Sequence, residues 1–184
     1  MYHDDCAVQT LALELVGSFA RVQEAIERVA ALYFDKNTPE LAKYVKRRAL
    51  KNMRDDDRIE VFKALVNELK VEISTPTFTS TFNSVKAHRD TIAHSARFTS
   101  EGEDTLIVST TEWLNVDGSH ETVRLSRSEL SKGIKRCDWM RHSAMYLLSR
   151  SGLIEKMMYN GQAVTITRPS PSPDDWTDEM FAAI

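Results

Sequence analysis

Residues 8–33 read VQTLALELVGSFARVQEAIERVAALY, and this stretch decides the fold class. Its apolar side chains recur in steps of three and four residues, at Val8, Leu11, Leu15, Phe19, Val22, Ile26, Val29 and Tyr33. That spacing is typical of one face of an α-helix. The sequence therefore predicts a long amphipathic helix near the start of the chain, and we expect a mainly helical protein.

Three further helices are expected before residue 96. Thr38 is a suitable N-cap and Pro39 a suitable first helical residue, which predicts a second helix that ends near Met53. The acidic run at residues 55–57 predicts the start of a third helix. Its apolar stripe is Ile59, Phe62, Leu65, Val66 and Leu69. A fourth helix is expected from about residue 77 to residue 95, with the stripe Phe78, Phe82, Val85, Ile92 and Ala96.

The periodicity changes after residue 103. Residues 104–114 and 119–125 are rich in strand-forming side chains and meet at Asp117-Gly118, which favours a type I′ turn. Ser126 and Glu129 then form a capping box that opens a last long helix. We expect a bundle of four to five helices over residues 1–152, with a β-hairpin at about 104–125 inserted before the last helix. Residues 153–184 are expected to form a C-terminal extension.

Composition excludes several classes of protein. The chain has 184 residues but only 6 Gly, with none between Gly17 and Gly102, so this stretch holds no glycine-rich phosphate loop. Its two cysteines cannot form a four-ligand zinc site, and they favour a reducing compartment. Acidic residues interrupt any signal-peptide core, and no apolar run reaches the roughly twenty residues of a membrane span. We therefore expect a cytoplasmic protein without membrane contact, and its net charge of −3 does not by itself suggest a nucleic-acid partner.

One segment of the fourth helix carries candidate chemistry. Arg89 falls on the apolar stripe, so its guanidinium must meet a carboxylate, a phosphate or a second subunit. His94 follows Asp90 by four residues, within reach of a carboxylate that could orient its ring. An arginine that holds phosphate and a histidine that titrates near neutrality suffice for RNA cleavage without a metal. Arg136 and His142 form a comparable pair on the last helix, although His142 is expected at the helix surface.

The run Arg89-Asp90-Thr91-Ile92-Ala93-His94-Ser95 resembles the signature of the HEPN (higher-eukaryote and prokaryote nucleotide-binding) superfamily. The resemblance implies a helical bundle over about residues 7–150 and a homodimer whose two motifs share one cleft. Many members are endoribonucleases of toxin, abortive-infection and RNA-targeting CRISPR systems. Others have lost catalysis and act as binding, scaffold or antitoxin-like modules.

The resemblance also implies roles for individual residues. His94 would act as base or acid on the RNA sugar, and Arg89 would stabilise the charge that develops on the phosphorus. Asp90 would orient His94, and Ser95 could bind the RNA backbone. This chemistry needs no metal and no cofactor, and a neutralising antitoxin or another defence protein is a possible partner. A structural salt link at a helix end, or a motif that has lost activity, remains an alternative.

Two charged segments complete the prediction. The second helix is basic and lacks acidic residues from Leu41 to Arg54, and one of its faces would carry Lys43, Arg47, Lys51 and Arg54. That face is either an ordinary solvated surface or a footprint for an RNA backbone. The sequence near the C-terminus predicts a disordered tail that contains Trp176 and Phe181. The acidic residues of this tail are Asp174, Asp175, Asp178 and Glu179. We hypothesise that this tail competes with RNA for the basic face.

Overall fold

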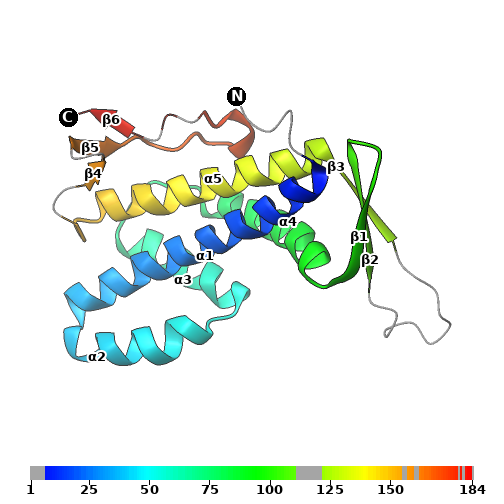
Figure 1. Ribbon diagram of the computed structural model, residues 1–184. Coiled ribbons are helices and arrows are strands. Elements are labelled where there is room, and N and C mark those ends of the chain that lie inside the picture. The colour runs from blue at the N-terminus through cyan, green and yellow to red at the C-terminus, as the bar shows by residue number, and fades with distance from the viewer. Residues whose placement is uncertain are drawn as a thin grey trace.

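The computed structural model describes residues 7–110, 122–154, 157–159, 162–177, 179 and 181–183. Within this part, the chain forms five α-helices. They are α1 (Val8–Asn37), α2 (Pro39–Tyr44), α3 (Asp55–Glu68), α4 (Thr75–Ala93) and α5 (Arg127–Arg150). The predicted class is confirmed: the protein is a helical bundle with strands inserted before the last long helix (Figure 1).

Helices α1 and α5 form the centre of the bundle and lie side by side along much of their lengths (Figure 1). The predicted stripe of α1 is buried from Val8 to Val29, which confirms that its periodicity marks the core face. Gly133 of α5 allows the close approach, because a β-carbon there would lie 2.9 Å from Leu15 Cδ1. Helices α3 and α4 close the core through stacked Phe62 and Phe78 rings, whose centroids are 3.9 Å apart.

The second helix is shorter than predicted. Helix α2 ends at Tyr44, and the chain continues as a π-helical turn (Val45–Ala49) and a 3₁₀ turn (Leu50–Asn52). The Thr38 hydroxyl does not cap the helix; it donates a hydrogen bond backwards to the Phe34 carbonyl, at 3.3 Å. Arg54 is extended and precedes α3, so it does not continue the helix that carries Lys43.

The inserted strands form a three-stranded antiparallel sheet in the order β1 (Ser95–Glu101), β2 (Thr105–Thr110), β3 (Thr122–Ser126). Strands β2 and β3 are the two arms of the predicted hairpin, while the predicted Asp117-Gly118 turn lies outside the described residues. Strand β1 corrects the prediction that the fourth helix reaches residue 95, because the helix ends at Ala93 and Ala96 belongs to the sheet. The predicted capping box is confirmed, with Ser126 N donating to Glu129 Oε2 at 2.7 Å.

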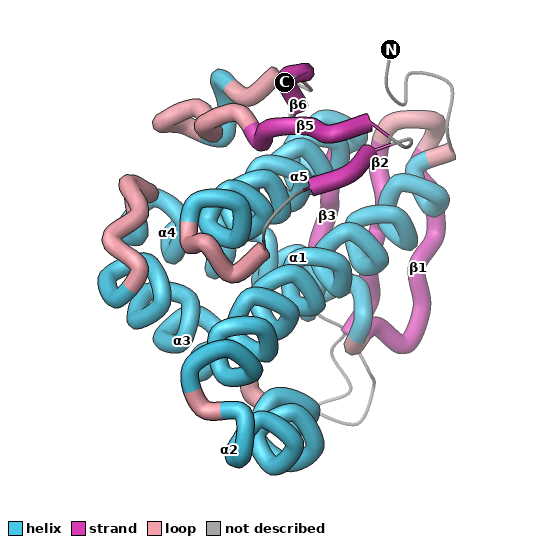
Figure 2. Tube along the Cα trace, turned by 90° about the vertical axis from the view of Figure 1, so that its left-hand side faces the viewer, coloured by secondary structure: helices cyan, strands magenta, loops and turns pink. Residues whose placement is uncertain are grey.

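The C-terminal segment also forms a sheet, in the order β4 (Met157–Tyr159), β5 (Gln162–Ile166), β6 (Phe181–Ala183). Figure 2 shows this sheet above α5, on the opposite side of the bundle from α2. A 3₁₀ turn at Pro173–Asp175 packs against α5, and Trp176 is 7% exposed. The expected disordered tail is therefore wrong for the described part of this segment. None of the helices in the described ranges is both long and apolar enough to cross a membrane.

Candidate functional site

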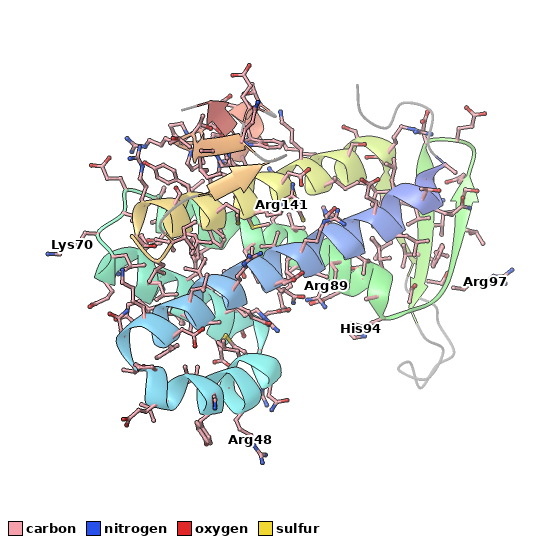
Figure 3. All side chains as sticks on the ribbon, turned by 60° about the vertical axis from the view of Figure 1, so that its left-hand side comes forward. Arg48, Lys70, Arg89, His94, Arg97 and Arg141 are labelled. Carbon is pink, nitrogen blue, oxygen red and sulfur yellow. The ribbon has the colours of Figure 1, made fainter. Side chains whose placement is uncertain are left out.

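Arg89 lies on the buried face of α4 and meets a carboxylate of its own chain. Its Nη2 donates to Asp55 Oδ2 at 2.5 Å, and its Nη1 lies 3.0 Å from Asp90 Oδ1. The guanidinium carbon stands 4.7 Å from the centre of the Phe19 ring, a distance typical of a cation–π contact. Figure 3 shows the side chain directed beneath α1. The sequence required a partner for this charge, and the partner is the first residue of α3.

Asp55 joins three helices. Besides Arg89, it accepts hydrogen bonds on Oδ1 from Gln23 Nε2 of α1 at 2.5 Å and from Arg58 Nη1 of α3 at 3.0 Å. Its side chain is only 13% exposed. The sequence predicted Asp55 as a helix-start residue and missed this role. The sequence did indicate that a buried arginine needs an acidic partner. It contains many acidic residues, however, and does not show which of them lies close to Arg89.

His94 points the other way. It follows the last residue of α4, where its backbone N–H donates to the Asp90 carbonyl at 3.0 Å. Its ring is exposed, and no hydrogen bond or ion pair reaches that ring from the residues that the structure describes. Figure 3 shows the ring projecting outward from the end of the helix. The imidazole is therefore open to a ligand or to a second protein molecule.

The expected Asp90–His94 contact is replaced by others. Asp90 Oδ2 accepts from Lys86 Nζ at 2.8 Å, one helical turn earlier, while Oδ1 faces Arg89. This hydrogen bond is the main reason that the pKa of Lys86 is raised. His94 has left the helical conformation (φ −99°, ψ 8°), so the usual i,i+4 alignment with Asp90 is lost. Ser95 Oγ donates to the Ile92 carbonyl at 2.7 Å and closes the end of the helix.

One chain does not bring Arg89 and His94 together. Five residues along a helix correspond to a rotation of about 140°. The structure follows this geometry, since Arg89 faces α1 and α3 while His94 faces solvent. A site that uses both groups on one phosphate needs a second molecule.

The basic segment at residues 43–54 only partly matches its prediction. Lys43, Arg48 and Arg54 are exposed, whereas the side chains of Lys46, Arg47 and Lys51 lie outside the described residues. Because the helix changes to π and 3₁₀ geometry, Lys43 and Arg54 do not share a face of one regular helix. The segment remains a cationic surface of the bundle.

The second candidate pair, Arg136 and His142, is structural. His142 is 2% exposed, so its predicted surface position is wrong. Its Nδ1 accepts from Trp176 Nε1 at 3.0 Å, and its Nε2 lies 2.8 Å from the Thr167 carbonyl. Burial lowers the pKa of His142, and both contacts suit a neutral ring that carries its proton on Nε2.

The acidic end of the chain contacts α5. Asp174 Oδ2 lies 3.3 Å from Lys132 Nζ, and Asp174 Oδ1 lies 3.5 Å from Arg136 Nε. The described part of the tail is thus held on α5 and not on the basic segment at residues 43–54. This geometry contradicts the hypothesis that Asp174 competes with RNA for that segment.

The other reactive groups among the described residues add no further site. Cys137 is buried, and burial raises the pKa of its thiol, so it is not a poised nucleophile. In the described ranges, no group of three or more His, Cys, Asp or Glu side chains is arranged to hold a metal ion.

No family model matches the chain, and comparisons with curated proteins and with solved structures found no match. The Arg89–His94 motif and its geometry are therefore the features of the described residues that bear on function.

Proposed function

We propose that the protein is a HEPN-type endoribonuclease that cleaves RNA without a metal ion, with His94 as its proton-transferring group. The observation that carries the proposal is the exposed His94 ring, which has no intramolecular partner among the described residues and stands at the end of a well-packed helix. Histidine is the side chain best suited to both taking up and releasing a proton in this role. The motif resemblance supports a setting in toxin or phage-defence systems.

The proposed reaction is an internal transesterification. One His94 removes the proton from a ribose 2′-OH, and the 2′-oxygen attacks the adjacent phosphorus. The bond from phosphorus to the 5′-oxygen breaks, and that oxygen takes a proton from a second His94 that is in its protonated, imidazolium form. The products are a 2′,3′-cyclic phosphate and a free 5′-OH. Because one chain supplies one such histidine at this site, we propose that two copies place their α4 ends at a shared cleft.

Arg89 enters this reaction in one of two ways. It stabilises the phosphorane directly if the phosphate replaces Asp55, or it holds the end of α4 in place through that ion pair. In the first role, the partly buried ion pair between Arg89 and Asp55 must break, and this costs free energy. The side chains of Arg89 and Asp55 are 19% and 13% exposed. An Arg89→Lys variant keeps the charge but not the forked geometry. Loss of cleavage with unchanged stability would indicate direct contact with the phosphate, and loss of both would indicate that Arg89 holds the end of α4.

A specific observation favours a second candidate, a non-catalytic binding or scaffold module of the same family. Arg89 is already neutralised by Asp55 and Asp90 inside its own chain, as expected for a structural arginine. In that case the motif would stabilise the bundle, and the exposed His94 would contact a partner protein such as a toxin or an antitoxin.

Incubation of purified protein with end-labelled RNA in EDTA decides between the endoribonuclease and the non-catalytic module. His94→Ala should lower the cleavage rate by about 10²- to 10⁴-fold, the usual contribution of an acid–base group. His88→Ala is the matched control on the same helix and should cleave like the wild type. Cyclic phosphate ends should appear among the products.

The two candidates give different results. If clean, folded wild-type protein leaves RNA intact, the non-catalytic module is supported. If wild type, His94→Ala and Arg89→Ala cleave equally, the activity is a contaminant and the enzyme proposal fails. Light scattering tests the shared cleft separately, since a stable monomer of 21.0 kDa at assay concentration would remove it.

A further inference from the structure

The outer face of α2 carries an unusual aromatic side chain. In the described part of the chain, four large apolar side chains are exposed, and Tyr44 is the most exposed of them at 67%. Leu41, three residues earlier, is 57% exposed and lies on the same face of the helix. The inner face of this segment is buried through Ala42 and Leu50. Tyr44 is therefore not a core residue that the fold requires.

The segment around and after Tyr44 is rich in positive charge, although the exposed Glu40 lies one helical turn before Tyr44. From Leu41 to Arg54 the sequence contains six Lys or Arg residues and no Asp or Glu. Lys43 is adjacent to Tyr44 and Arg48 follows one turn later; both are exposed. Figure 3 shows Arg48 projecting into solvent, on the same lower side of the view as His94.

We propose that this α2 surface, made of Leu41, Lys43, Tyr44 and the following Arg48, binds single-stranded RNA, with a base stacked on the Tyr44 ring. Cations beside an exposed aromatic ring are the combination that single strands need, because their phosphates seek positive charge and their unpaired bases offer flat faces. A duplex would satisfy only the cations, since its bases are already stacked. The turn of π-helix directly after Tyr44 is a feature that often occurs at functional positions.

Charge argues against a second copy as the occupant of this surface. A two-fold contact through the α2 surface would place its cations against the same cations of the other molecule. Asp174, one of the acids of the C-terminal segment, lies instead against Lys132 and Arg136 of α5. Figure 2 shows α2 at the edge of the bundle, so an extended strand can reach it from outside.

This inference rests on the proposed function in one respect, namely that the bound nucleic acid is RNA. The experiment that tests it therefore measures binding and does not depend on cleavage. The probe is a fluorescein-labelled 2′-O-methyl oligoribonucleotide of about twelve nucleotides, which lacks the 2′-OH needed for cleavage. Fluorescence anisotropy compares it with the same strand in a duplex. Wild-type protein should bind the single strand more tightly than the duplex.

Three variants identify the groups involved. Tyr44→Ala should weaken single-strand binding by about 5- to 150-fold, the range measured for loss of one base–aromatic stack. Tyr44→Phe keeps the ring and should stay within about twofold of wild type. Lys43→Ala should reduce the dependence of log K on log salt by about 0.7, the value for one phosphate contact on a single strand. Leu13→Ala, which removes an exposed apolar side chain of α1, is the matched control and should bind like the wild type.

Each unfavourable outcome is informative. Equal binding by Tyr44→Ala and wild type, or equal affinity for single strand and duplex, would overturn the stacking role. Self-association that Tyr44→Ala abolishes would assign the surface to a second copy and reject the proposal. Probe binding that depends on Tyr44, together with no cleavage of unmodified RNA, would keep this inference and remove the enzyme. Cleavage that depends on His94, with RNA binding and cleavage that do not depend on Tyr44, would keep the enzyme and remove this inference.

Discussion

The Asp55→Ala substitution tests the Arg89–Asp55 ion pair. The endoribonuclease and the non-catalytic module differ in the role that they give to Arg89 in this pair. Asp55 accepts hydrogen bonds from Gln23, Arg58 and Arg89, and its side chain is 13% exposed. Loss of one partner of a buried pair costs about 3–5 kcal/mol, because it leaves the other charge without compensation. We expect about 3 kcal/mol, the lower end of that range, because Arg89 keeps Asp90 and Arg58 keeps Glu27. For a chain of this size, that loss lowers the melting temperature by about 6–12 °C.

Urea unfolding followed by tryptophan fluorescence measures this loss, since Trp139 and Trp176 are both buried. Asp56→Ala is the matched control: Asp56 is the exposed neighbour in the same helical turn, and its loss should change the free energy of unfolding by less than about 0.5 kcal/mol. A double-mutant cycle with Arg89→Met should give a coupling energy of about 1–3 kcal/mol. If the two single-variant costs simply add, the ion pair does not stabilise the fold and the structural role of Arg89 is refuted.

Three further predictions concern local stability. Lys70 ends α3 in a left-handed conformation (φ 53°), so Lys70→Gly should raise the free energy of unfolding by about 0.5–1 kcal/mol, whereas Lys70→Ala should leave it nearly unchanged. Ser126→Ala removes the N-cap of α5 and should cost about 1 kcal/mol in urea unfolding, with exposed Ser128→Ala as its control. Because burial lowers the pKa of His142, the unfolded chain binds a proton on this ring more readily than the folded chain does. The free energy of unfolding should therefore fall as the pH drops below about 6.5, by at most about 1.4 kcal/mol per pH unit from this group, and His142→Gln should show a flatter pH dependence.

Local patterns predicted the elements whose side chains face the core. The stripe of α1 and the capping box of α5 depend on residues within one or two turns of each other, so sequence spacing was sufficient. Strand β1 was missed for the opposite reason. Its residues from Arg97 to Glu101 are exposed, so they show no alternation of buried and exposed side chains, and the strand exists through backbone pairing with β2.

Contacts between distant residues were beyond sequence reasoning. His142 resembles a helix-surface residue until the chain returns 25 and 34 residues later to cover it with Thr167 and Trp176. The acid opposite Arg89 lies 34 residues earlier in the chain. In both cases the sequence showed which side chain needed a partner, and only the packing of the helices determined which residue supplied it.

The orientation of α4 limits the roles that Arg89 and His94 can take. Arg89 cannot leave the core side of the helix without exposing Phe19 and Asp55, and the exposed His94 lies beyond the end of that helix and faces solvent. Within one chain, the arginine therefore stabilises the bundle and the histidine is free for contact with another molecule. If two copies meet at their α4 ends, two free imidazoles become available for the two proton transfers of RNA cleavage, and Arg89 is needed only to hold those ends in place. In that arrangement Arg89→Lys should impair stability and cleavage together, whereas His94→Ala should lower cleavage by about 10²- to 10⁴-fold and leave the free energy of unfolding unchanged.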